Sequence, residues 1–159
     1  RFIPVIPNSV YGPNDNFDEN TGHVLSALTA RFTTAVKNDY DVVKLWGTGR
    51  ARREFIHSED VARACEHFLT LENLEVTCPF NLGVGYDISI KDLAELIAKH
   101  TGFQKHIEWD DTKPEGTVQK LLDSKKVFDL GWKPTIHLDN GIKSTISWYK
   151  DFLETENAG

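Results

Sequence analysis

The sequence predicts a mixed α/β domain in which the edge of a parallel sheet is combined with several amphipathic helices. Short apolar runs bounded by proline or glycine indicate strands, and longer segments carry apolar residues at helical spacing. The first apolar run also ends in a long irregular loop, where α/β proteins commonly place ligand-contacting groups. With 159 residues, the chain is long enough for one domain with its own core.

The first predicted strand covers residues 2–6, a short apolar run that ends at a proline, and we expect it to be buried. Residues 8–17 follow as a loop rich in asparagine, glycine and proline, which are the residues that favour turns. A loop in this position is predicted to contact a ligand.

The first predicted helix covers residues 24–36, whose apolar side chains recur at helical spacing. Thr21 is the candidate cap of this helix. We expect His23 in the first turn, at the positive end of the helix, and Arg31 two turns later on roughly the same side.

An arginine-rich stretch, Trp46–Glu54, follows a strand-like run of valine, lysine and leucine. This stretch, called the arginine loop below, is punctuated by glycines and carries Arg50, Arg52 and Arg53. Because the chain has a net charge of −6, arginines gathered here indicate a local anion site. The planar guanidinium suits bidentate recognition of phosphate, and the tryptophan offers a flat face to a ring or a sugar. A solvated loop is the alternative.

The rest of the chain is predicted to alternate between helices and strands. Helices are expected to follow the caps Ser58 and Ser89 and to cover residues 124–130 and 138–153, and strands to cover residues 79–83 and 106–109. In the Ser58 helix, the buried stripe is expected to be Val61, Cys65, Phe68 and Leu69. The Ser89 helix has a capping box with Asp92 and a left-handed terminator at Gly102, and residues 113–120 form a polar loop.

Composition argues against several classes of protein. The 24 acidic residues against 18 basic ones argue against a nucleic-acid or anionic-membrane partner, and no apolar run approaches the length of a membrane span. Cys65 and Cys78 lack metal-site spacing, so we expect no metal site and interpret them as reduced core thiols of a cytoplasmic protein. Because methionine is absent, we expect the chain to be part of a larger protein.

Two glycine patterns, Gly47-Thr-Gly49 and Gly83-Val-Gly85, begin like a dinucleotide-binding fingerprint. The third glycine is missing from both, and neither pattern opens a helix at the required place. We interpret both as tight turns.

Several motifs together resemble one family. They are Pro7-Asn-Ser-Val-Tyr-Gly-Pro-Asn-Asp-Asn-Phe17, Gly22-His-Val24, Trp46-Gly-Thr-Gly49, Arg53-Glu-Phe55, Asn81-Leu-Gly83, Lys113-Pro-Glu-Gly-Thr117 and Gly131-Trp132. From residue 1 to about residue 150, the chain resembles the C-terminal half of an extended short-chain dehydrogenase/reductase. Within that superfamily it is most similar to the GDP-L-fucose synthases, which are NADP-dependent epimerase-reductases.

The resemblance implies a Rossmann-type architecture divided between this chain and an upstream segment. Residues 1–17 would hold the end of the parallel sheet and the active-site loop, and residues 18–153 the substrate-binding lobe. The NADP-binding domain and the family's Tyr-x-x-x-Lys pair and catalytic cysteine would lie upstream, so we interpret Tyr40-Asp-Val-Val-Lys44 as a coincidence. This chain alone would be inactive, and the intact protein a homodimer.

The resemblance also assigns roles to individual residues. His23 matches the acid/base group of epimerisation. Residues matching cofactor contacts are Pro7, Asn8, Ser9, Val10 and His23, and residues matching contacts to the GDP-sugar are Arg31, Trp46, Arg53, Glu115 and Lys120. Ser9 and Glu115 depart from the family, which commonly has Asn and Asp there.

Two other functions remain open from the sequence. The chain can belong to another nucleotide-sugar epimerase or dehydratase of the same superfamily. It can also be a non-catalytic module that binds a nucleotide-sugar.

Overall fold

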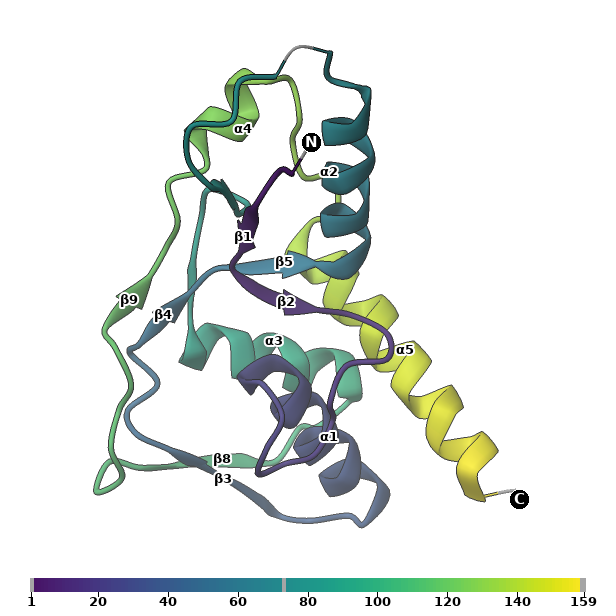
Figure 1. The fold of residues 1–159 in the computed structure, drawn as a ribbon. Coiled ribbons are helices and arrows are strands. Elements are labelled where there is room, and N and C mark those ends of the chain that lie inside the picture. Colours follow the sequence, from purple (N-terminus) through teal and green to yellow (C-terminus); the bar gives the residue numbers. More distant parts are fainter. Residues whose placement is uncertain (1, 73, 158–159) are drawn as a thin grey trace.

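Short parallel strand pairs, each joining segments far apart in the sequence, form the framework of the fold (Figure 1). The structure is a computed structural model that describes residues 2–72 and 74–157. The parallel pairs are β1 (Val5–Pro7) with β6 (Phe80–Leu82), β2 (Ser9–Tyr11) with β5 (Phe55–His57), and β3 (Val42–Trp46) with β8 (His106–Asp110). Strand β4 (Arg52–Arg53) lies between β7 (Ile88–Ser89), which is antiparallel to it, and β9 (Gln119–Lys120), which is parallel.

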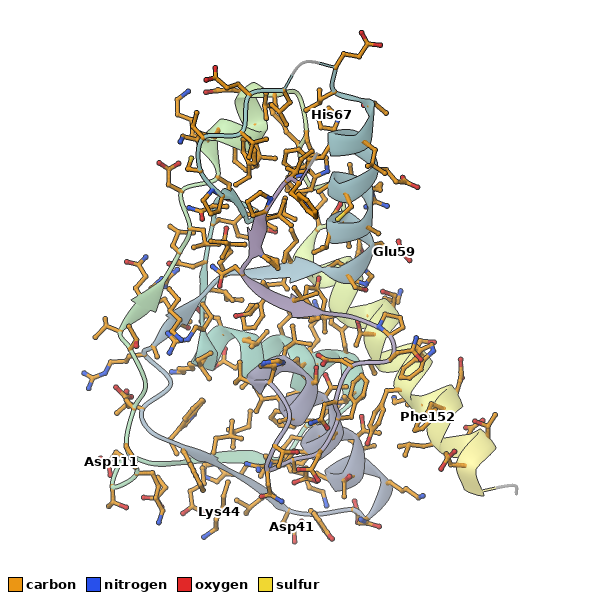
Figure 2. All side chains as sticks on the ribbon, viewed as in Figure 1. Asp41, Lys44, Glu59, His67, Asp111 and Phe152 are labelled. Carbon is orange, nitrogen blue, oxygen red and sulfur yellow. The ribbon has the colours of Figure 1, made fainter. Side chains whose placement is uncertain are left out.

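The helices divide the apolar core into two parts. Their bounds are α1, Val24–Lys37; α2, Ser58–Thr70; α3, Ile90–Thr101; α4, Lys125–Asp129; and α5, Leu138–Asn157. One apolar cluster lies where α1 and α3 lie beside the β3–β8 pair and α5 packs against α1, α3 and β5, and the other where α2 and α4 flank β1 and β6. Figure 2 shows side chains filling these interiors, whereas Asp41 and Lys44 project outward beside β3. None of the described helices is both long and apolar enough to cross a membrane.

Most predicted elements are present close to their expected bounds. The α/β fold class is confirmed, as are the strands at residues 79–83 and 106–109 and the helices after Ser58 and Ser89. Ser89 caps α3 by accepting a hydrogen bond from the backbone N–H of Asp92 at 3.0 Å, and Gly102 ends it with φ of +91°. Both glycine patterns form turns rather than helix starts, and Gly49 has φ of +73° where a Cβ would lie 2.7 Å from the Trp109 ring.

The first strand differs from the expectation of a buried strand. Instead of one strand over residues 2–6, two short strands meet at Asn8. Phe2 is 94% exposed and Ile6 48% exposed. The reason is that, within the described ranges, β1 pairs with β6 alone, so its other edge has no covering strand.

Two predicted helix caps are wrong. Thr21 does not cap α1, because its N–H and hydroxyl bond to the Asp18 carboxylate, and His23 is the N-cap residue instead. Ser58 is the first residue of α2, and His57 caps it by accepting the N–H of Glu59 at Nδ1, at 3.2 Å. Histidine is an uncommon cap, so side-chain preference did not indicate either position.

The predicted stripe of α2 is confirmed at Phe68 and Val61, which lie in or against the core, but it is wrong at Cys65 and Leu69, and the interpretation of the cysteines as core thiols is also wrong. Cys65 and Leu69 are exposed, and the inward face is formed by Asp60, Ala64 and Phe68, at intervals of four residues. The buried carboxylate of Asp60 determines which face of α2 is turned toward the core, because Asp60 lies on that face with the apolar side chains. Cys78 is not a core thiol either: it is partly exposed, and the Lys126 ammonium donates to its Sγ at 3.0 Å.

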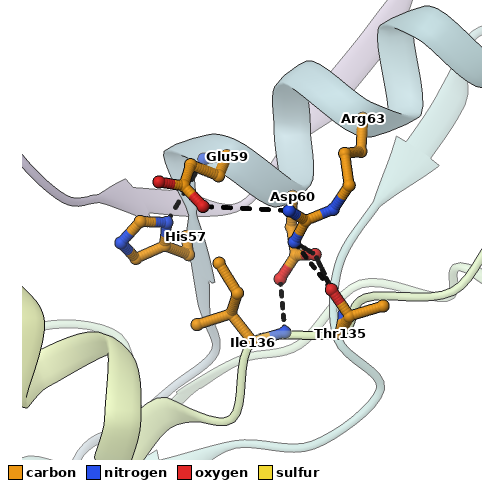
Figure 3. Close-up of polar contacts among 6 residues, drawn as sticks. All are labelled: His57, Glu59, Asp60, Arg63, Thr135 and Ile136. Atoms are coloured by element: carbon orange, nitrogen blue, oxygen red, sulfur yellow. Dashed lines mark hydrogen bonds and ion pairs between the residues drawn. The ribbon is translucent and has the colours of Figure 1, made fainter.

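Asp60 ties the start of α2 to the segment before α5 (Figure 3). Its fully buried carboxylate accepts the backbone N–H groups of Thr135, at 2.9 Å, and Ile136, at 3.0 Å. Arg63 adds a charged hydrogen bond of 2.6 Å. Burial alone would raise the pKa of Asp60, but these hydrogen bonds outweigh burial and lower the pKa below its ordinary value.

Replacing Asp60 with Asn should destabilise the fold in a pH-dependent way. At pH 7 we expect the free energy of unfolding to fall by about 2–3 kcal/mol, because buried donors lose a charged acceptor. Since the folded-state pKa is depressed, the stabilisation is present above the unfolded pKa of about 4 and is lost as pH falls through the folded value. Urea denaturation of parent and Asp60→Asn at pH 7 and at pH 3 checks this.

The exposed Asp151 on α5 provides the control, because Asp151→Asn changes the same atoms without removing a buried acceptor. The difference between parent and Asp60→Asn should narrow at pH 3, whereas Asp151→Asn should match the parent throughout. Equal stability of parent and Asp60→Asn at pH 7 would contradict this role.

Candidate functional site

A cleft of about 660 Å³ lies beside the junction of β1 and β2. It is called the His23 cleft below, and its lining includes Pro7, Asn8, Ser9, Val10, His23 and Lys120. The structure thus brings every residue predicted to contact the cofactor into one place. It adds Lys120, which was predicted to contact the substrate and which arrives on β9, far along the chain.

The cleft also contains residues that the sequence did not single out. Tyr11, Gly12 and Ser58 line it, because β2 leads directly past the start of α2. Gly12 has φ of +147°, and a Cβ there would lie 2.5 Å from the Ser58 hydroxyl oxygen. The positive φ and this close approach both require glycine. In the sequence, the pair Gly12-Pro13 was the feature that could have indicated this turn.

His23 is placed at the rim of the His23 cleft by its position as the N-cap residue of α1. Its backbone carbonyl accepts the Ala27 N–H at 2.8 Å, which holds the residue at the helix start. The side chain is exposed, and within the part of the chain that the structure describes its imidazole has no hydrogen-bond partner. The ring is therefore available to a ligand.

Glu54 is the buried charge on which this region is built. Its fully buried carboxylate accepts hydrogen bonds from Val84 N–H (2.7 Å), Gly85 N–H (2.8 Å), the Asn8 side-chain amide (2.6 Å) and Leu122 N–H (3.0 Å). The Asn8 side chain is thereby turned toward Glu54. Sequence reasoning missed Glu54; an acidic residue directly before the apolar pair of β5 was the available signal.

A second pocket, of about 320 Å³, lies between α1 and the ends of β3 and β8. Arg31, Trp46, Trp109, Glu19 and Asn20 line it together with apolar side chains, and we call it the Trp46 pocket. Arg31 is held there by the Glu19 carboxylate at 3.2 Å and by the Lys44 carbonyl at 3.1 Å. Trp46 is 68% exposed, so its ring face is open.

His23 and Arg31 line different cavities, although they were expected on roughly the same side of α1. Eight helical residues turn through about 800°, which leaves two side chains about 80° apart. His23 also has extended rather than helical backbone angles. The structure therefore separates the acid/base candidate from the arginine.

The three arginines of the arginine loop have different environments. Arg52 forms a salt bridge of 2.7 Å with Asp87, and the Arg50 side chain donates to the Thr48 hydroxyl at 2.9 Å. Arg53 is held by the backbone carbonyls of Arg52 and Thr117. The three are not one anion cluster: among the described residues neither Arg50 nor Arg53 forms a salt bridge, and Arg53 is the one held by two backbone carbonyls.

The 113–120 loop is attached to the arginine loop by Glu115. Its carboxylate accepts the backbone N–H of Thr48 at 2.6 Å and also the Thr48 hydroxyl. These two hydrogen bonds lower the pKa of Glu115. Glu115 therefore already has partners within the chain, although the resemblance assigned it a ligand contact.

The described residues include no group of three or more His, Cys, Asp or Glu side chains arranged to hold a metal ion.

Residues 1–83 match the profile of the NAD dependent epimerase/dehydratase family, over more than half of the chain. The chain belongs to this family. It is 43% identical over 151 residues to GDP-L-fucose synthase 1 of Arabidopsis thaliana, covering 92% of this chain and 45% of that protein. It is 40% identical over 160 residues to GDP-L-fucose synthase of Escherichia coli (strain K12), covering 96% of this chain and 49% of that protein.

Solved structures of the family share the fold. A GDP-L-fucose synthetase from Naegleria fowleri bound to NADP matches with a TM-score of 0.87 and 30% identity, over 97% of this chain and 48% of that one. The chain thus spans about half the length of the relatives it matches. The expected resemblance to family members of this kind is confirmed.

Replacing Glu54 with Gln should destabilise the segments that converge on its carboxylate. A glutamine retains one oxygen but presents an amide NH₂ to two of the surrounding donors, so at least two buried hydrogen bonds are lost. We expect the free energy of unfolding to fall by about 2–4 kcal/mol. Urea denaturation followed by circular dichroism measures the change.

The exposed Glu95 on α3 offers the matched control, Glu95→Gln, which should stay within about 0.5 kcal/mol of the parent. If Glu54→Gln were as stable as Glu95→Gln, the buried carboxylate would not have the role assigned to it.

Proposed function

We propose that this chain is the substrate-binding part of an NADP-dependent GDP-4-keto-6-deoxy-D-mannose 3,5-epimerase-4-reductase, which makes GDP-L-fucose. The observation that carries the proposal is the His23 cleft, where an exposed histidine, the segment after β1 and the Lys120 ammonium meet. The similarity to GDP-L-fucose synthases from a plant and a bacterium supports the same reaction.

His23 is the proposed acid/base group. Epimerisation beside a carbonyl requires a proton to be removed from carbon and returned on the opposite face, and imidazole exchanges protons near neutral pH. Its position at the rim of the cleft leaves the ring accessible to a sugar. A partner for the second proton transfer, the family's cysteine, is proposed to lie in the upstream segment.

The segment Pro7–Val10 is proposed to pass along the nicotinamide of NADP. The residues present fit such a group, because Pro7, Asn8, Ser9 and Val10 line the cleft together and Ser9 has a small side chain. When bound, NADPH supplies the hydride for the reduction. A related synthetase from Naegleria fowleri binds NADP, which supports this cofactor. Most of the cofactor is proposed to contact a preceding domain of a longer, cytoplasmic, homodimeric protein.

The GDP part of the substrate is proposed to extend from the His23 cleft toward the Trp46 pocket. Arg53 and Lys120 are register partners on β4 and β9, and both suit the diphosphate. Trp46 and Arg31 line the neighbouring pocket, where the tryptophan offers a stacking face. Glu115 contributes through Thr48 rather than by direct contact.

The first test uses the chain by itself. It should bind GDP-L-fucose with one-to-one stoichiometry, yet oxidise no NADPH when mixed with GDP-4-keto-6-deoxy-D-mannose, because the hydride-donor domain is proposed to lie upstream. Calorimetry measures the binding of GDP-L-fucose, and the absorbance of the reduced nicotinamide follows the oxidation of NADPH. NADPH consumption by the pure chain, or the absence of GDP-L-fucose binding, would contradict the proposal.

The second test separates two residues. Arg53→Ala should weaken binding of GDP-L-fucose by roughly 2–4 kcal/mol, because a charged phosphate contact is lost. His23→Ala should leave that binding nearly unchanged and, in the full-length enzyme, abolish epimerisation measured by solvent-deuterium incorporation. Arg50→Ala, on the same loop, controls for the removal of a positive charge. Equal affinities of the Arg53→Ala and Arg50→Ala variants would contradict the role of Arg53.

A further inference from the structure

The Arg53 guanidinium is fixed by one of its nitrogens. Nη1 donates to the Thr117 carbonyl at 2.6 Å and to the Arg52 carbonyl at 2.7 Å. Among the described residues, neither Nε nor Nη2 has a hydrogen-bond partner. The two N–H groups that point the same way from Nε and Nη2 form the edge that binds phosphate oxygens in pairs. Arg53 is therefore held in place while its bidentate edge stays open.

The charges around this edge favour an anion. Arg53 and Lys120 are direct register partners on two parallel strands, and cations paired in this way repel each other. Among the described residues neither forms a salt bridge, although Arg52 next to them pairs with Asp87. A bound anion between the two cations would remove the repulsion.

Gly116 lies close to Nη2, one of the two nitrogens of the open edge. A Cβ placed on Gly116 would lie 2.9 Å from Nη2 of Arg53, and no other atom is within 4 Å of it. The φ angle of Gly116 is not positive, so its backbone does not itself require glycine. The requirement is for space beside Nη2.

Residues 115–117, called the strap below, lie against the arginine loop and contact it through both Glu115 and Thr117. Glu115 anchors the strap to Thr48, and Thr117 supplies the carbonyl that orients Arg53. Gly116, between them, is consequently held at a fixed position close to the guanidinium. The strap has no other contact in which glycine at 116 is needed.

We propose that Gly116 is a positioning residue for anion recognition: by lacking a Cβ, it leaves the Nε–Nη2 edge of Arg53 free for one phosphate of a nucleoside diphosphate. The inference rests on the proposed function, in which Arg53 binds the diphosphate. It adds a residue that sets the geometry of this contact without touching the ligand.

The experiment compares Gly116→Ala, Arg53→Ala and the double variant, with GDP and guanosine as probes in calorimetric titrations of the full chain. The added methyl group should push the guanidinium aside and raise the Kd for GDP about tenfold, while the Kd for guanosine stays unchanged. In the double variant, Gly116→Ala should add nothing to the loss caused by Arg53→Ala, because its effect passes through the arginine. Thermal unfolding should stay at the parent temperature in each variant.

Pro114→Ala is the matched control, since it changes backbone freedom in the same loop and should leave GDP binding unchanged. Parent-like GDP binding by Gly116→Ala, or additive losses in the double variant, would overturn the inference while a weakened Arg53→Ala still upholds the proposed function. If Arg53→Ala itself binds GDP like the parent, the proposed function and the inference both fail. Equal weakening of GDP and guanosine would indicate a structural role and overturn the inference.

Discussion

The buried carboxylate of Glu54 is the constraint on which the arrangement of the site depends. A buried charge is tolerated only when its hydrogen-bonding capacity is filled, and here the donors come from the β1–β2 junction, the turn after β6 and the segment after β9. These segments must converge for the charge to be buried. Gly83 is part of the same requirement, because a Cβ there would lie 2.4 Å from a Glu54 oxygen. Asn8 is thereby set in the wall of the His23 cleft, and Arg53, next to Glu54 in the chain, lies on β4 beside Lys120.

The charged side chains of this region fall into two groups, those that bind partners inside the chain and those that are open to a ligand. Asp60, Arg52 and Arg31 are all engaged with partners inside the chain, so they hold segments together. His23, Lys120 and the open edge of Arg53 are not engaged among the described residues. This contrast, rather than the number of arginines in the loop, is the basis of the proposed ligand-binding region in a chain with a net charge of −6.

The resemblance assigned roles to individual residues, but it did not determine how those residues are grouped in space. Pro7–Val10 and His23 were predicted together and do share a cleft. Lys120 and Arg31 were both assigned to the substrate, yet Lys120 lies with His23 and Arg31 lies with Trp46. Glu54, Gly116 and Thr117 were not singled out, because each is identified by a contact to a distant segment and not by its own local pattern.

The sequence by itself determined the helices and the strands β3, β6 and β8, and through its motifs the family. Apolar spacing, the Ser89 cap and the Gly102 terminator act within one or two turns of chain, so their signals are local. Only the tertiary structure decided that the first strand has an exposed edge and that α2 turns Asp60 inward. It alone paired Arg52 with Asp87, 35 residues away, and Arg53 with Thr117, 64 residues away. Such partners are chosen by strand pairing between distant segments, and local patterns of residues do not specify that pairing.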